Sequence, residues 1–120
     1  MIWLAVAVAG ALGAACRYVL DHAVTVTGGG RLPLGTALVN VSGSFAAGLV
    51  AGLAARHLLP ADSVLVIAGG FLGAYTTFST AMYQSLRLWE AGARPTAAVN
   101  LLGPLLSAAA AVTLGWWVAM

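Results

Sequence analysis

The sequence contains no lysine and very few charged residues of any kind. Only 7% of its 120 residues are charged, whereas roughly a quarter are charged in a typical soluble domain. At the same time 62% are hydrophobic, more than so small a globule can bury, because small domains bury the smallest fraction of their surface. The composition therefore excludes a soluble domain and indicates a membrane protein. The five arginines are spread along the chain without forming a basic patch, so nucleic acid is not an expected partner.

Acidic and lysine side chains are absent from the deep parts of the apolar segments, and cysteine occurs once. Proton-coupled pumps and cation exporters need a buried ionisable group to bind and release their ions. Its absence favours passive conduction, or no transport. Cys16 has no second cysteine with which to form an intrachain disulfide, and it stands among alanines, which is typical of a small packing residue.

Four apolar segments are each long enough to cross a bilayer, which takes about 20 residues per helix. We expect four membrane-spanning helices within a single domain, 1–120, at about residues 2–26, 34–58, 63–88 and 96–119. The loop after the first span, residues 27–31, is rich in glycine and is expected to be flexible. The sequence thus predicts an all-α, multi-pass membrane protein.

Arginine is distributed almost evenly between the two sides of this bundle. Arg31 and Arg94 fall on one side, with Arg87 close by, and Arg56 falls on the other side with the amino terminus. Orientation follows the Lys/Arg asymmetry between the two sides. So slight a bias permits insertion either way up, and hence an antiparallel dual-topology homodimer, but it also permits one orientation set by few charges.

The stretch Gly69–Ala81 is unusual for the middle of a membrane span. Its thirteen positions include three glycines, four serine or threonine residues and two phenylalanines. Glycine permits unusual backbone angles, and hydroxyl groups can bond the carbonyls that an interrupted helix leaves unpaired. One interpretation is a helix break at mid-membrane that serves an ion, since irregular backbone survives there only inside protein or along a polar path. The other is a glycine-rich packing seam. The stretch alone leaves both open.

Few other polar residues lie inside the spans. Asn40 has an amide that can donate two hydrogen bonds, which suits a dehydrated anion, although alone it favours an interhelical hydrogen bond of about 0.6 kcal/mol. Asn100 and Ser107 share a face of the fourth span and allow either packing or function. Arg17 can form a structural ion pair with Asp21 one turn later, or attract anions at a vestibule if it is unpaired.

Small residues recur at four-residue spacing on three spans, which lets helix backbones approach closely. These ridges predict tight helix packing, including packing against a second copy of the chain. They comprise Ser44, Gly48 and Gly52 on the second span, Gly69 and Gly73 on the third, and Gly103, Ser107, Ala111 and Gly115 on the fourth.

Three motifs occur in order along the chain. Residues 13–18 read Gly-Ala-Ala-Cys-Arg-Tyr, residues 35–45 read Gly-Thr-Ala-Leu-Val-Asn-Val-Ser-Gly-Ser-Phe, and residues 70–80 read Gly-Phe-Leu-Gly-Ala-Tyr-Thr-Thr-Phe-Ser-Thr. They resemble the signatures of the first three helices in the Fluc (CrcB-type) bacterial fluoride channels. The resemblance covers essentially the whole chain.

This resemblance implies a fluoride channel of the cell membrane, not an enzyme, that gives passive export of fluoride and so relieves its toxicity. It implies an antiparallel dimer with two narrow pores and a structural sodium ion at the dimer centre. The carbonyl groups of Gly73 and Thr76 would hold the sodium, where two broken third helices cross. The implied ion pathway consists of Asn40, Phe78 and Ser107, with the nearby hydroxyl groups of Thr77, Ser79 and Thr80.

The chain departs from the family pattern at Ala81, where the resemblance calls for a second pore phenylalanine. Partially positive phenyl edges suit an anion path, so losing one ring is expected to widen the pore. Either conduction differs, or Tyr83 or Met82 fills the gap, or the chain is a non-conducting or heterodimer partner subunit. A small multidrug exporter is a further rival, but it needs a membrane-embedded glutamate, and Glu90 falls in a loop.

Overall fold

The structure is a computed structural model that describes residues 1–28 and 33–120, and these residues form helices only. The part of the expected flexible loop that comprises Gly29, Gly30 and Arg31 lies outside the described residues. In chain order the elements are α1 (Ile2–Thr27), α2 (Leu34–Ala55), α3 (Ala61–Val64), η1 (Leu65–Leu72), α4 (Gly73–Tyr75), α5 (Phe78–Glu90) and α6 (Arg94–Ala119).

Four segments are long and apolar enough to cross a membrane. They are Ile2–Thr27, Leu34–Ala55, Ala61–Glu90 and Arg94–Ala119. The prediction of an all-helical chain with four spanning segments is therefore confirmed. The expected second span reached about residue 58, whereas α2 ends at Ala55, because His57 takes a left-handed conformation (φ 57°) and Leu58 N–H bonds back to the Leu53 carbonyl.

The third segment consists of several elements. α3 continues into η1, a π-helix, which is a rare geometry that often occurs at functional sites. α4 then ends at Tyr75, and the next two residues are extended, with φ −81° and ψ 157° at Thr76 and φ −150° and ψ 123° at Thr77. We call Thr76–Thr77 the extended link. It divides the segment into α3–η1–α4 before it and α5 after it.

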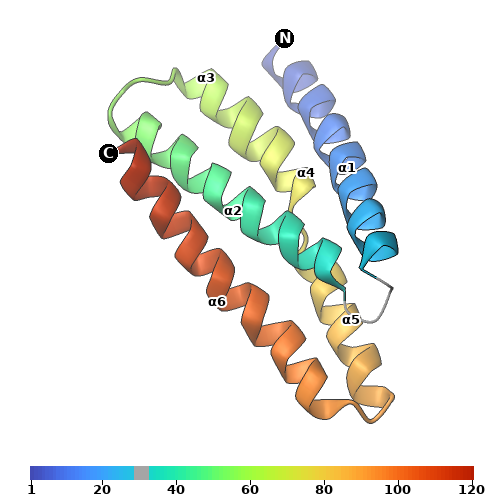
Figure 1. Ribbon diagram of the computed structural model, residues 1–120. Coiled ribbons are helices and arrows are strands. Elements are labelled where there is room, and N and C mark those ends of the chain that lie inside the picture. Colours follow the sequence, from blue (N-terminus) through green and yellow to red (C-terminus); the bar gives the residue numbers. More distant parts are fainter. Residues whose placement is uncertain (29–32) are drawn as a thin grey trace.

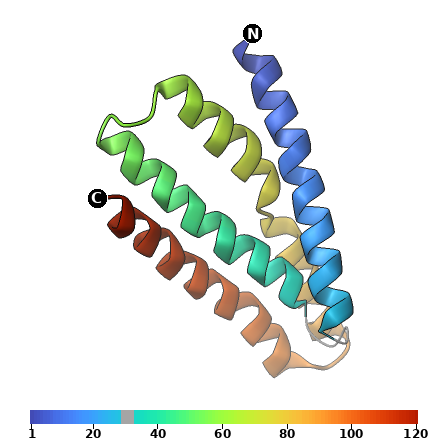
Figure 2. The same cartoon turned by 45° about the horizontal axis from the view of Figure 1, so that its top comes forward.

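The helices form an open bundle around this link. α2 and α6 run side by side along most of their lengths, and α1 packs along η1 and α4. After the link, α5 turns toward the first half of α6, as Figure 1 shows. Both termini lie at the same end of the molecule as the α2–α3 connection, opposite the α5–α6 turn (Figure 2).

Several helix pairs approach closely at glycine, among them α2–α6 and α1–η1. A Cβ atom on Gly48 of α2 would overlap the Val112 carbonyl of α6, and one on Gly115 would overlap the Phe45 carbonyl of α2. On the other side of the bundle, a Cβ on Gly13 of α1 would overlap the carbonyl of Phe71 in η1. Such contacts are typical of membrane helices, whose association depends on close packing.

Other members of the predicted ridges have no partner helix inside the described chain. A Cβ on Gly103 would meet nothing within 4 Å, and those on Gly69 and Gly73 would meet only atoms of their own segment. Ser107 is exposed on α6. The small-residue ridges thus account for the α2–α6 contact, and they leave a second set of small residues uncovered.

Candidate ion pathway

The extended link removes several backbone groups from helical hydrogen bonding, and local side chains replace the lost partners. The amide and the hydroxyl of Thr76 both donate to the Leu72 carbonyl, at 3.0 Å each. Thr77 is the N-cap of α5, because its hydroxyl oxygen accepts from Thr80 N–H at 3.3 Å. The Thr77 hydroxyl also donates to Thr80 Oγ1 at 3.0 Å.

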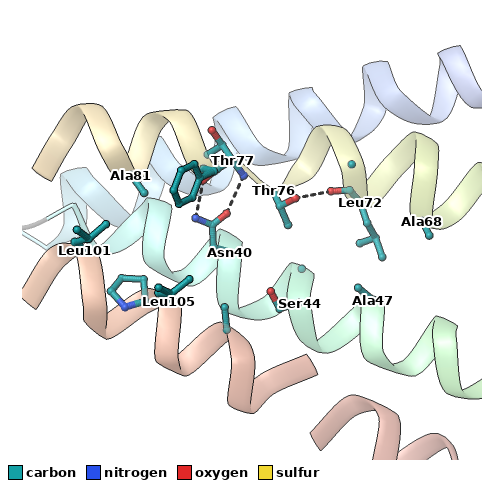
Figure 3. Close-up of a pocket in the computed structure, with 15 residues that line it drawn as sticks. Asn40, Ser44, Ala47, Ala68, Leu72, Thr76, Thr77, Ala81, Leu101 and Leu105 are labelled. Carbon is teal, nitrogen blue, oxygen red and sulfur yellow. Dashed lines mark hydrogen bonds between the residues drawn. The ribbon is translucent and has the colours of Figure 1, made fainter. Parts of the chain in front are cut away.

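Asn40 of α2 binds the link through both ends of its amide. Its Nδ2 donates to the Thr77 carbonyl at 2.8 Å, and its Oδ1 accepts from Thr77 N–H at 2.8 Å (Figure 3). The interhelical hydrogen bond left open by the sequence is therefore formed. An asparagine amide carries two N–H groups, so one remains after the contact with Thr77.

The carbonyl groups of the last turn before α5 lose their helical donors, and those of Gly73 and Thr76 are two of them. In a continuous helix Thr77 N–H would donate to the Gly73 carbonyl, but it donates to Asn40. Thr80 N–H would likewise donate to the Thr76 carbonyl, but it donates to the Thr77 hydroxyl. The carbonyl oxygens of Gly73 and Thr76 are thereby released from the helical pattern.

Arg17 lies against the same link. Its Nη1 donates to the Thr76 carbonyl at 3.5 Å, a long contact. The considered ion pair with Asp21 is not formed: within residues 1–28 and 33–120 the one salt bridge joins Arg87 and Glu90. Asp21 Oδ1 instead accepts from the Thr36 hydroxyl at 3.2 Å. Arg17 therefore belongs to the polar contacts of the link, and of its two interpretations the ion pair with Asp21 is not formed.

A groove of about 360 Å³ runs beside the link, between α2, α6 and the third segment. Figure 3 shows Asn40 and Thr77 joined across it, with Leu101 and Leu105 of α6 on the far side. The walls are largely apolar, so the polar groups of Asn40 and the link stand out. The lining residues that the sequence singled out are Asn40, Ser44, Gly73, Thr76, Thr77, Phe78 and Ala81.

The remaining sequence candidates lie outside the groove. Ser79 is exposed on the first turn of α5, with its hydroxyl 3.3 Å from that of Thr77. Thr80 is half-buried and bonds to Thr77. Ser107 is exposed on α6, and the structure does not bring it to Asn40 or Phe78 within this chain. Phe78 lines the groove while 67% of its surface stays exposed.

The position of the missing ring is a wall of this groove. Ala81 lines it, together with Leu101 and Leu105. Neither Met82 nor Tyr83 is a lining residue, and Tyr83 is 63% exposed. Within one chain, then, neither side chain fills the space that a phenylalanine at position 81 would occupy.

Sequence reasoning missed a polar chain that joins three helices near the groove. Gln84 Nε2 donates to the Thr36 hydroxyl at 3.0 Å, and Thr36 in turn donates to Asp21. Gln84 Oε1 is buried without a hydrogen-bond partner. Thr36 precedes Asn40 by one helical turn, and Gln84 follows Thr77 by two turns. This helical spacing is the feature of the sequence that could have placed Thr36 and Gln84 near the site. A second contact, Asn100 Nδ2 to Ser85 Oγ at 2.8 Å, joins α6 to α5.

Known proteins resemble this chain along nearly its whole length. The family described as "CrcB-like protein, Camphor Resistance (CrcB)" matches residues 4–116. The chain is 43% identical to the "Fluoride-specific ion channel FluC 1" of Leifsonia xyli, over 98% of this chain and 85% of that protein. It is also 43% identical to FluC 1 of Frankia casuarinae, over 96% and 93%. It is 38% identical to FluC 2 of Mycobacterium tuberculosis, over 98% and 90%.

Proposed function

Because this chain belongs to the CrcB-like family, whose relatives are named fluoride-specific ion channels, we propose that it is a fluoride channel. It conducts fluoride passively out of the cell across the plasma membrane and so relieves fluoride toxicity. As a member of a family of channels, it is not an enzyme. The observation that best supports the proposal is the groove where Asn40, Thr77 and Phe78 meet.

The groove offers the contacts that a dehydrated fluoride ion needs. Moving an ion from water into a medium of low dielectric constant costs on the order of tens of kcal/mol unless new contacts replace the water. The second N–H of Asn40 and the ring edge of Phe78 are the proposed replacements inside the groove. The hydroxyl groups of Thr77, Ser79 and Thr80 are proposed to contribute beside it, by turning from their contacts with one another toward the ion. No acidic side chain lines the groove, which agrees with passive anion movement.

We assign the extended link to the mid-membrane break of the third helix, and the carbonyl groups of Gly73 and Thr76 to a structural sodium ion that is not transported. Sodium is a hard cation that prefers oxygen ligands. Both carbonyls have lost their helical donors, because Thr77 N–H and Thr80 N–H bond elsewhere. These oxygens are of the kind that sodium takes, and the ion would share the Thr76 carbonyl with the long contact from Arg17. Two carbonyls from one chain are too few for a complete site, so a second copy must supply the rest.

The second copy is proposed to be antiparallel, in a dual-topology homodimer. Small residues without a partner helix in this chain provide the surface that such a dimer needs: Gly69, Gly73, Gly103 and Ser107. Ser107 then contributes to the ion pathway from the neighbouring copy, because within one chain it lies outside the groove.

Ala81 favours one alternative, a non-conducting or heterodimer partner subunit, since the groove lacks the second ring. A small multidrug exporter has less support. Its necessary glutamate is missing from the groove, and Glu90 is the last residue of α5, 57% exposed and paired with Arg87.

The deciding experiment is ion efflux from liposomes that contain only this chain, loaded with fluoride or with chloride. We expect rapid fluoride efflux, little chloride efflux, and a loss of fluoride efflux when sodium is replaced by a large organic cation on both sides. A stable dimer that passes no fluoride would overturn the channel proposal and favour the partner subunit. Fluoride efflux indifferent to sodium would overturn only the sodium assignment.

A further inference from the structure

Tyr75 is the last residue of α4, and its side chain is hydrogen-bonded to α2 next to the extended link. The Tyr75 hydroxyl lies 2.9 Å from Ser42 Oγ, and Ser42 Oγ donates to the Val39 carbonyl at 3.2 Å. A serine hydroxyl has one hydrogen. Because the carbonyl can only accept, the hydrogen of Ser42 points to Val39, and Tyr75 must donate to Ser42.

The ring of Tyr75 is held from two further sides. It stacks on Phe71 of η1, with ring centroids 5.7 Å apart and planes 16° apart. On the α2 side, a Cβ on Gly43 would lie 3.0 Å from Tyr75 Cδ1 and would overlap the methyl group of Thr76. The absence of a side chain at Gly43 is thus what lets the end of α4 lie against α2.

α2 therefore holds the chain on both sides of Thr76. Asn40 binds the backbone of Thr77 after it, and Ser42 binds the side chain of Tyr75 before it. The Thr76 carbonyl lies between these two anchors. Neither Ser42 nor Tyr75 lines the groove, so neither is placed to touch an anion there.

We propose that Tyr75 and Ser42 are positioning residues: their hydrogen bond fixes the end of α4, and with it the carbonyl groups of Gly73 and Thr76. Asn40 binds the backbone of the extended link itself, whereas the Tyr75–Ser42 contact fixes the turn before the link and so orients the released oxygens. The structural part of this inference stands on the contacts alone. Its consequence for sodium rests on the proposed function.

The test compares the full chain with the variant Tyr75→Phe, which removes one hydroxyl and leaves Ser42 bonded to Val39; hydrogen exchange is measured in nanodiscs and fluoride flux in liposomes. We expect backbone hydrogen exchange in residues 72–78 to rise roughly three- to tenfold, as the loss of one anchoring hydrogen bond predicts. The sodium concentration for half-maximal fluoride flux should rise by a similar factor, roughly three- to tenfold. The matched control is Tyr83→Phe, an exposed tyrosine on α5 that has no hydrogen bond in the described part of the chain, and it should change neither quantity.

A second variant separates positioning from a general loss of stability. Ser42→Ala leaves the Tyr75 hydroxyl without its acceptor, which is worse than having no hydroxyl at all. Adding Tyr75→Phe to Ser42→Ala should therefore make exchange no faster, and should restore part of the lost thermal stability. Exchange in residues 72–78 equal to wild type in Tyr75→Phe, or additive effects of the two changes, would overturn the proposal. If the wild-type chain passes no fluoride, the proposed function fails, and the exchange measurement still judges this inference.

Discussion

At the scale of single residues, Asn40 is the best-defined member of the candidate pathway. It exchanges two hydrogen bonds of 2.8 Å with the backbone of Thr77, as two paired residues do in a β-ladder. It therefore has a structural part as well as the proposed contact with the anion. The two parts can be separated, because one amide N–H is engaged and the other is available.

The substitution Asn40→Asp removes both donors and adds a negative charge. The carboxylate would face the Thr77 carbonyl and repel an anion by about 4 kcal/mol at 4 Å with an effective dielectric constant of about 20. We expect fluoride efflux from liposomes to fall at least about a hundredfold, since about 1.4 kcal/mol corresponds to each tenfold change. Asn100→Asp makes the same chemical change outside the groove and should have a much smaller effect. Undiminished efflux through Asn40→Asp would remove Asn40 from the pathway.

The substitution Ala81→Phe restores the ring that the family pattern calls for. Ala81 is a wall of the groove, so the new ring edge should narrow the path and add one favourable anion contact. Edge contacts between aromatic rings contribute about 0.5–1.5 kcal/mol. A ring-edge contact of that order that the narrower path reserves for the smaller anion should raise the ratio of fluoride to chloride flux roughly three- to tenfold. Met82→Phe, next to it but outside the groove, serves as the control. An unchanged or lower ratio in Ala81→Phe would mean that the ring has no part in selectivity here.

The sequence predicts some of these residues and misses others for a physical reason. Asn40 could be singled out because an amide is unusual in an apolar helix, whereas Phe78 could be singled out only by the resemblance of its motif to the family signature. Gln84 and Tyr75 could not, because their partners Thr36 and Ser42 are on another helix, and the choice depends on how α2 packs against the third segment. Helical spacing alone allows an Arg17–Asp21 ion pair. In the structure each of the two residues instead contacts another helix.

At the scale of elements, the α2–α6 pair is the most closely packed part of the bundle. Gly48 and Gly115 each lie against a carbonyl of the other helix. Apolar length is enough to predict the four spanning segments, and small-residue spacing predicts which faces pack. Neither signal predicts η1, because a π-helix has no distinct composition. Neither signal predicts which of the small-residue ridges pair within one chain.

We expect Gly48→Ala to destabilise the protein, because the methyl group must push the Val112 carbonyl away. Overpacking of this kind costs about 1–3 kcal/mol, so the midpoint of thermal unfolding in detergent should fall by several degrees. Gly10→Ala on α1 is the matched control, since a Cβ there makes only ordinary contacts, 3.6 Å from the Gly70 carbonyl oxygen and 3.9 Å from Ala74 Cβ, and alanine is the better helix former by roughly 0.8–1 kcal/mol. Equal midpoints for the two variants would show that the α2–α6 contact is looser than described.

At the scale of the whole molecule, both termini lie at one end of the bundle (Figure 1), and the arginine bias between the two ends is slight. In a dual-topology protein, a tag after Met120 should face each side of the membrane in about half of the molecules. External protease on spheroplasts should therefore remove about half of the tags. Extra arginines beside the tag should bias the orientation and lower fluoride flux, because antiparallel pairs become rare. Complete protection or complete removal of the tag in the original chain would contradict dual topology.

The order of the contacts along the chain has a consequence for biosynthesis. An extended backbone in lipid is costly, because each unsatisfied polar group costs several kcal/mol. The partners of the link, Arg17 on α1 and Asn40 on α2, come before Thr76 and Thr77 in the sequence, and synthesis proceeds from the N-terminus. They are therefore already in the bilayer when the ribosome delivers the link. A circular permutant that begins at α3 would have to insert the same residues with no partner present, and should reach the membrane in much lower yield.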